Sequence, residues 1–134
     1  MITAYTTRQT IDVTSLYGGF LDREDDRSGT VVMHHGMVKR PGKQIADFSS
    51  VELIECAPDV DEKLVQLAHA AVQRYKLNQV LLVHRLGCLG ARDTVLVAIV
   101  SGTTRDRCFS GCQFLVDEIK KEALITLIEH GAEK

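Results

Sequence analysis

The chain has 134 residues, of which 45% are apolar and 25% are charged, and its net charge is −2. These values fit one domain over residues 1–134 with one core, and they argue against a disordered chain or a coiled coil. No basic field is present, so nucleic acid is not an expected partner. No apolar run approaches the roughly 20 residues that cross a bilayer, and the N-terminus lacks the pattern of a signal peptide. We therefore expect a cytoplasmic protein without a membrane partner.

The first part of the chain predicts a helix followed by two strands. Ile11 to Leu21 has moderate helical spacing, and the charged stretch from Asp22 to Ser28 predicts a loop. Thr30 to Val38 is rich in β-forming residues and predicts a strand. After a turn at Pro41-Gly42, the partial alternation from Asp47 to Cys56 predicts a second strand.

The second part predicts two helices around a β-hairpin. Asp59 to Tyr75 has apolar residues at helical spacing and is the clearest helix. Gln79 to Leu86 and Thr94 to Ser101 are apolar, β-branched strands, and the link between them, Gly87 to Asp93, is short enough for antiparallel pairing. A stripe of apolar residues predicts a final helix from Arg105 to Leu127. The expected class is α+β, with a mixed, largely antiparallel sheet and flanking helices.

Standard nucleotide and zinc motifs are missing from the sequence. Neither G-x-G-x-x-G nor a Walker A loop occurs, and the four cysteines include no C-x-x-C pair. Cys108 and Cys112 would share one helix face, a spacing that suits two buried thiols as well as two metal ligands. Without a signal peptide, reduced buried thiols are the preferred interpretation. The alternative is a metal-binding protein that uses these cysteines and histidines.

Two segments have the chemistry of an anion site. The basic loop Lys39-Arg40-Pro41-Gly42-Lys43 presents three cations on a rigid turn, which can bind phosphate or can simply be a solvated hairpin tip. The segment from Ser101 to Arg107 leads from a strand through a Gly/Thr loop into a helix N-terminus. Free backbone N–H groups, hydroxyls, the helix dipole and Arg105 favour an anion there. Lys120 follows the apolar Ile119 and lies either at the edge of the buried stripe, where a lysine can act in catalysis, or on the surface.

Histidines offer weaker indications. His34 and His35 are neighbours on a predicted strand, so they point to opposite faces and cannot bind one metal together. His84 and Arg85 end another predicted strand and also alternate between faces, so a structural and a functional role remain equally open. No Ser/His/Asp or Cys/His triad and no carboxylate pair emerges from the sequence order.

Taken together, these segments resemble the large, catalytic subunit of molybdopterin synthase. The resemblance runs from the loop before Gly29 to about Glu129, and its joint spacing is specific where single pieces are not. The matching segments are Gly29-Thr30-Val31-Val32, Gly36-Met37-Val38-Lys39, His84-Arg85-Leu86-Gly87 and Asp93, followed by Arg105, Phe109, Gln113-Phe114, Asp117 and Lys120.

The resemblance implies a hammerhead-like α/β fold, a homodimer and a defined reaction. A small ubiquitin-like partner would donate sulfur from the thiocarboxylate at its C-terminal Gly-Gly, and its tail would insert into a pocket near the last helix. The substrate would be cyclic pyranopterin monophosphate, and the product would be the molybdopterin dithiolene. The family needs no metal at this step, so no cofactor is expected.

The resemblance also implies roles for single residues. Lys39 stands where the family usually has a substrate-contacting arginine, and Thr104 and Arg105 stand where it has a histidine followed by an arginine. Lys120 matches the first of two functional lysines. We therefore expect Lys120 to be catalytic and the substrate to be bound by Lys39, Arg40, Thr104 and Arg105.

One position departs from the family pattern. Leu127 falls where the second functional lysine is expected, so one cation is lost from the reaction. A charge-assisted contact contributes about 1.5–3 kcal/mol, so its loss predicts impaired activity rather than none. Lys121 or Lys134 are candidates to replace it. The alternative function is a non-catalytic homologue that binds the small subunit or the pterin without full turnover.

Overall fold

The computed structural model describes residues 1–121 and 123–131. Its helices are α1 (Val13–Asp22), α2 (Val60–Tyr75) and α3 (Arg105–Lys121). Its strands are β1 (Ile2–Thr7), β2 (Thr30–Met37), β3 (Ser50–Glu55), β4 (Gln79–Arg85), β5 (Gly87–Leu89), β6 (Thr94–Gly102) and β7 (Ile125–His130). The main sheet has the strand order β1-β4-β6-β2, and a smaller sheet has the order β5-β3-β7.

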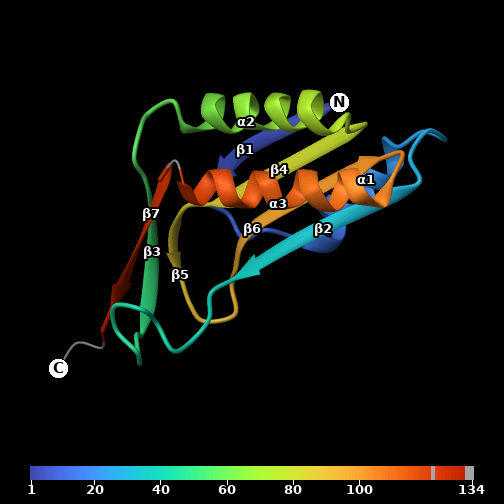
Figure 1. The fold of residues 1–134 in the computed structure, drawn as a ribbon. Helices are drawn as coiled ribbons and strands as arrows, with labels where there is room; N and C mark the ends of the chain where they lie inside the picture. The colour runs from blue at the N-terminus through green and yellow to red at the C-terminus, as the bar shows by residue number, and fades with distance from the viewer. Residues whose placement is uncertain (122, 132–134) are drawn as a thin grey trace.

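Most strand pairs are antiparallel, and helices cover the main sheet. β1 pairs with β4 in parallel, whereas β4 with β6 and β6 with β2 pair antiparallel. Both pairs of the smaller sheet are antiparallel as well. Figure 1 shows α2 and α3 side by side over one face of the main sheet, while α1 packs on the other face. The predicted α+β class with a largely antiparallel sheet and flanking helices is confirmed.

Alternation along the two central strands gives the main sheet two apolar faces. Neighbouring strand residues point to opposite faces, so Leu82 and Ala98 pack beneath α2 and α3, whereas Val83 and Val97 pack against α1. Cys108, Cys112, Leu115 and Ile119 form the buried stripe of α3. This packing fixes the position of α3 on the sheet, and with it the residues that α3 carries at its ends.

A close approach at Gly111 brings α3 down onto the segment between α2 and β4. A Cβ atom on Gly111 would lie 2.9 Å from Leu77 Cδ1. That distance is too short for a real carbon contact, so the buried Leu77 side chain would have to shift to admit a larger residue here.

Polar side chains hold the loop after α1 against the end of the main sheet. Glu24 accepts hydrogen bonds from the buried hydroxyl of Ser101, from Gln79 Nε2 (3.0 Å) and from Asn78 Nδ2 (3.2 Å). Burial raises the pKa of Glu24, but the hydrogen bonds from Ser101, Ser28 and Gln79 more than offset this, so its pKa lies below the usual range. The carboxylate is therefore charged at neutral pH and fixes the loop.

The prediction of one helix from Arg105 to Leu127 is wrong at its C-terminal end. α3 ends at Lys121, and Ala123 has a left-handed φ of 50°. Ile125 begins β7, which pairs with β3 along its length. The sequence Ile-Thr-Leu-Ile is rich in β-branched residues, and pairing with β3 makes the strand the favoured conformation. The spacing of Ala123 and Leu127 imitates a helical stripe by coincidence.

Two short strands were not predicted. β1 contains three threonines and gives no clear apolar alternation, yet it pairs with the buried strand β4. β5 lies within the predicted hairpin link and pairs with β3. Both strands exist because a partner strand satisfies their backbone groups, which local sequence does not reveal.

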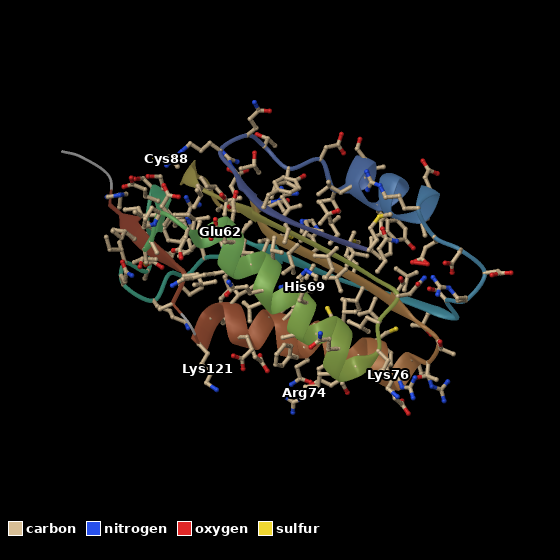
Figure 2. The ribbon with its side chains drawn as sticks, turned by 90° about the horizontal axis from the view of Figure 1, so that it is seen from above. Glu62, His69, Arg74, Lys76, Cys88 and Lys121 are labelled. Atoms are coloured by element: carbon tan, nitrogen blue, oxygen red, sulfur yellow. The ribbon has the colours of Figure 1, made fainter. Side chains whose placement is uncertain are left out.

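Charged side chains cover the outer surface of the two helices above the main sheet. Figure 2 shows Glu62 and Arg74 on α2 and Lys121 at the end of α3, where Lys121 points away from the rest of the chain. Among the helices in residues 1–121 and 123–131, none is both long and apolar enough to cross a membrane.

Candidate active site

A cavity of about 500 Å³ opens where the main sheet meets the smaller sheet. Its volume lies within the roughly 300–1,000 Å³ of typical small-molecule sites. The walls come from the end of β2 and the following loop, the C-terminal half of α3, β7, and the adjoining ends of β4 and β6. Its polar and charged lining residues are His34, Lys39, Lys43, Gln44, His84, Lys120 and Glu129. The three lysines make this cavity suited to an anion.

Reciprocal hydrogen bonds attach the basic loop to β7. The Glu129 carboxylate accepts backbone N–H groups from Lys43 (3.0 Å), Gln44 (2.8 Å) and Ile45 (2.6 Å). In return, the Gln44 amide donates to the Leu127 carbonyl (3.0 Å) and accepts from the Glu129 N–H (3.0 Å). The hydrogen bond from Ile45, followed by those from Gln44 and Lys43, lowers the pKa of Glu129 despite some burial. The loop is therefore fixed over the cavity by contacts with a distant strand.

Gly42 and Arg40 complete the fixation of this loop. A Cβ atom on Gly42 would overlap the Glu129 carboxylate, so the loop can approach β7 only with glycine here. Arg40 Nε donates to the Phe48 carbonyl (3.0 Å), and its guanidinium lies 5.0 Å from the centre of the Phe48 ring. Arg40 is not among the residues that line the cavity. Of the cations in the loop, Lys39 and Lys43 reach the cavity and Arg40 braces the turn.

The floor of the cavity carries two histidines on one face of the main sheet. His84 on β4 and Gly36 on β2 both pair with Leu96 of β6, and His34 lies two residues before Gly36. His84 is buried, and its Nδ1 donates to the Arg85 carbonyl (2.8 Å) if this nitrogen carries the proton. Burial lowers the pKa of His84 more than this bond raises it. Gly36 has no side chain, which leaves room above the floor.

His34 and His35 face different surroundings, as alternation predicts. His34 lines the cavity, whereas His35 Nε2 lies 2.8 Å from Thr94 Oγ1, outside the cavity lining. Burial, followed by the positive charge of Lys120 and the neighbouring His35, lowers the pKa of His34. The ring of His34 is therefore neutral at neutral pH and lies near the lysine of α3.

Lys120 extends from the last turn of α3 at the edge of the buried stripe. Ile119 before it is 5% exposed, whereas Lys120 is exposed and lines the cavity. Lys121, the next residue, points away and pairs with Glu118 (3.8 Å) on the same helix. Of the two positions considered from the sequence, Lys120 thus takes the one at the edge of the buried stripe, and Lys121 is not among the residues that line the cavity.

The remaining predicted substrate ligands lie at the far end of α3. Arg105 begins the helix and Lys120 is in its last turn, so at a rise of roughly 1.5 Å per residue their Cα atoms lie about 22 Å apart. Thr104 and Arg105 are exposed and are not among the residues that line the cavity. One chain therefore brings Lys39 and Lys120 together but not Arg105.

The buried cysteines do not form a metal site within the described residues. Cys108 and Cys112 are both buried, and burial is the main cause that raises the pKa of each thiol. In residues 1–121 and 123–131, no three histidine, cysteine or acidic side chains gather closely enough to hold a metal ion. The two thiols pack as small apolar groups between α3 and the main sheet.

Comparison with known sequences assigns the family. The sequence model of the family described as MoaE protein matches residues 6–122. The chain belongs to the MoaE protein family. The matched region includes every predicted site residue, from Lys39 to Lys120.

Relatives and solved structures agree with this family. A molybdopterin synthase catalytic subunit from Ralstonia nicotianae is 34% identical over 84 residues, which are 60% of this chain and 48% of that protein. The chain thus spans about half the length of that relative. Molybdopterin synthase from Staphylococcus aureus has the same fold, with a TM-score of 0.85 at 21% identity over 98% of this chain and 93% of that one. A chain in the complex of subunits 1 and 2 of the molybdopterin-converting factor from Helicobacter pylori gives a TM-score of 0.77 at 12% identity, over 96% and 83% of the two chains.

Leu127 lies in the cavity of this MoaE-family chain, although it belongs to a strand. Its side chain points inward from β7, packs against the core of the smaller sheet and lines the same cavity as Lys120. The position that resembles the second family lysine therefore faces the site and is apolar. Of the two proposed replacements, Lys121 points away, and Lys134 lies outside the described residues.

Several residues of the site escaped sequence reasoning. Lys43 was recognised only as part of a basic loop, and Gln44 and Glu129 gave no signal because their bonds join segments far apart in the chain. His34 was recognised only as a strand residue that points to the opposite face from His35. A glycine next to a run of cations, as at Gly42, is the sequence feature that hints at a tightly held loop.

Proposed function

We propose that the chain is the catalytic subunit of a molybdopterin synthase. It transfers sulfur from the C-terminal Gly-Gly thiocarboxylate of a ubiquitin-like small subunit to cyclic pyranopterin monophosphate. The observation that carries the proposal is that Lys39 and Lys120, from different parts of the chain, line one cavity of about 500 Å³. The membership in the MoaE family and the name of the Ralstonia relative support the same reaction.

The charges in the cavity suit both reactants. A cyclic phosphate and a thiocarboxylate are anions, and charge-assisted hydrogen bonds from lysine are stronger than neutral ones. Lys39 and Lys43 extend from the rigid loop and hold the phosphate. Lys120 stabilises the negative charge that develops on oxygen or sulfur during transfer. The apolar walls lower the local dielectric constant and strengthen these interactions.

A homodimer explains why Arg105 and Thr104 lie far from Lys120 in one chain. Arg105 lies about 22 Å along α3 from Lys120, too far to touch a substrate that Lys120 contacts in the same chain. We propose that Arg105 and Thr104 of one copy complete the cavity of a second copy. A two-fold dimer would form two such shared sites, because each chain gives to the other what it receives.

Leu127 lowers the rate of this reaction without abolishing it. A cation at this position would add one charge-assisted contact, worth about 1.5–3 kcal/mol or roughly 10- to 150-fold in rate. Lys43 lines the same cavity and supplies a positive charge in its place. The apolar Leu127 also favours a second candidate function, in which the chain binds the small subunit or the pterin without full turnover.

Reconstitution tests the proposal and separates the two candidates. The chain is mixed with thiocarboxylated small subunit and cyclic pyranopterin monophosphate, and molybdopterin is measured. We expect product, and we expect Lys120→Ala to lower kcat by about 10- to 150-fold. Lys121→Ala is the matched control, since Lys121 is next in sequence but points away from the cavity. Complex formation without product would support the binding function instead.

A further inference from the structure

His34 is the open, unbonded histidine of the cavity. It lies on β2 beneath the C-terminal half of α3, and its Nε2 would be 3.2 Å from a Cβ atom on Gly36, so the ring extends over the gap that this glycine leaves. In the described part of the chain the His34 ring makes no hydrogen bond, unlike His35, which faces Thr94, and His84, which faces a backbone carbonyl. Its ring nitrogens are therefore free to meet a molecule in the cavity.

Among the titratable groups around the cavity, His34 is best suited to accept a proton. Burial, the charge of Lys120 and the neighbouring His35 keep its ring neutral at neutral pH, and a neutral imidazole is a base. The Glu129 carboxylate already accepts three backbone N–H groups. His84 is only 6% exposed and is held at Nδ1. The other titratable groups that line the cavity are Lys39, Lys43 and Lys120.

The proposed sulfur transfer requires such a base. The donor begins as a thiocarboxylate and ends as a carboxylate, so its acyl carbon loses sulfur and gains oxygen. Attack of the thiocarboxylate sulfur on a pterin side-chain carbon forms a carbon–sulfur bond and breaks the bond from that carbon to an ester oxygen of the cyclic phosphate. The phosphate oxygen leaves with the electron pair, and the product is a thioester that joins the two reactants. Water then adds to the acyl carbon, the carbon–sulfur bond to the donor breaks, and sulfur remains on the pterin as a thiolate. No electron is gained or lost. One proton must leave the water as it attacks, and the second leaves the carboxyl group, which ionises to the carboxylate.

We propose that His34 is the general base that takes this proton. Its ring nitrogen accepts the proton as the water oxygen attacks, while Lys120 on the opposite wall stabilises the oxyanion and the departing thiolate. The protonated ring then returns its proton to the thiolate or to solvent. The assignment rests on the proposed sulfur transfer. A neutral base on β2 accepts the proton, and a cation on α3 stabilises the negative charge.

The test compares His34→Asn with His35→Asn in the assembled complex with thiocarboxylated small subunit. We expect His34→Asn to lower kcat by about 10²- to 10⁴-fold, the usual contribution of a general base. A thioester adduct between small subunit and pterin should accumulate and appear in intact-mass spectra. The wild-type rate should fall toward acidic pH as the base becomes protonated, with an inflection below the ordinary histidine pKa because burial lowers the pKa of His34, and this limb should vanish in the variant. His35→Asn should behave like the wild type, since His35 bonds to Thr94 outside the cavity.

The possible outcomes separate this inference from the function on which it rests. A wild-type complex that makes no molybdopterin refutes both. A wild-type complex that turns over, beside a His34→Asn variant with unchanged kcat and pH profile, refutes only the role of His34. A variant that raises KM alone, without adduct, also refutes it, because His34 would then only bind substrate. His34→Gln gives a second variant of similar size, and the binding of small subunit to each variant confirms that it is folded.

Discussion

Lys43 and Leu127 line one cavity, the first with a positive charge and the second without one. Moving the positive charge from residue 43 to residue 127 tests how the site obtains its second cation. Lys43→Ala removes one cation that lines the cavity, and Leu127→Lys adds one from the neighbouring strand. The backbone N–H of residue 43 still donates to Glu129 in the alanine variant, so the loop stays attached. The change therefore removes charge with little change in structure.

The magnitude follows from the value of one charge-assisted contact. At about 1.5–3 kcal/mol, Lys43→Ala should lower kcat/KM by about 10- to 150-fold. Leu127→Lys in that background should recover at least about tenfold, because the new ammonium enters the same cavity. The lysine stem retains most of the apolar contact that Leu127 makes, so the melting temperature should change little.

The assay is molybdopterin formation with saturating small subunit, measured for both single variants, the double variant and the wild type. Binding of the small subunit and thermal unfolding serve as controls for folding. If Lys43→Ala keeps wild-type activity, Lys43 is not the second cation. If it loses activity and Leu127→Lys restores none, the cavity does not act through its total charge, and the reasoning is refuted.

Two further predictions concern the contacts that hold the site and the fold. Glu129→Gln should loosen the basic loop, because the glutamine carbonyl still accepts hydrogen bonds but its NH2 group cannot replace the second carboxylate oxygen. The variant should cost on the order of 10²-fold in kcat/KM if the lysines shift by about 1 Å. Because the pKa of Glu129 is lowered in the folded chain, its stabilising contribution is present above about pH 4.5 and is lost as the pH falls further, and the variant should lack this dependence in thermal unfolding measured against pH. Ser101→Ala should destabilise the fold by about 1–3 kcal/mol in urea unfolding, because it removes a buried hydrogen bond to Glu24, and an unchanged midpoint would contradict the role given to this bond.

Elements with strong periodicity were predictable from sequence, and elements that depend on a partner were not. The stripe of α2 and the apolar runs of β4 and β6 set their type locally, and the predicted antiparallel pairing of the last two is confirmed. The segment from Ala123 to Leu127 was assigned to the wrong type, because apolar residues at 123 and 127 fit a helix as well as a strand. Only the pairing with β3 decides between the two conformations.

The site residues also include some that could be predicted from the sequence and some that could not. The family resemblance assigned Lys39 and Lys120 to an anionic substrate where local sequence left their roles open, and both line the cavity. The resemblance placed Arg105 and Lys120 in one site although the predicted helix separates them, because a resemblance aligns positions along a chain and does not say whether one copy supplies both. The bonds between Gln44 and β7 join residues more than 80 positions apart, so no local pattern encodes them.

The attachment of the basic loop to β7 also has a consequence for synthesis of the chain. The loop and the histidine floor are made early, but the strand that holds the loop in place is the last strand of the described chain. A ribosome that has completed α3 has therefore produced both Lys39 and Lys120 without a finished cavity. The chain can bind substrate only after β7 emerges and pairs with β3. Substrate therefore stabilises only the finished fold and gives no protection to shorter nascent chains.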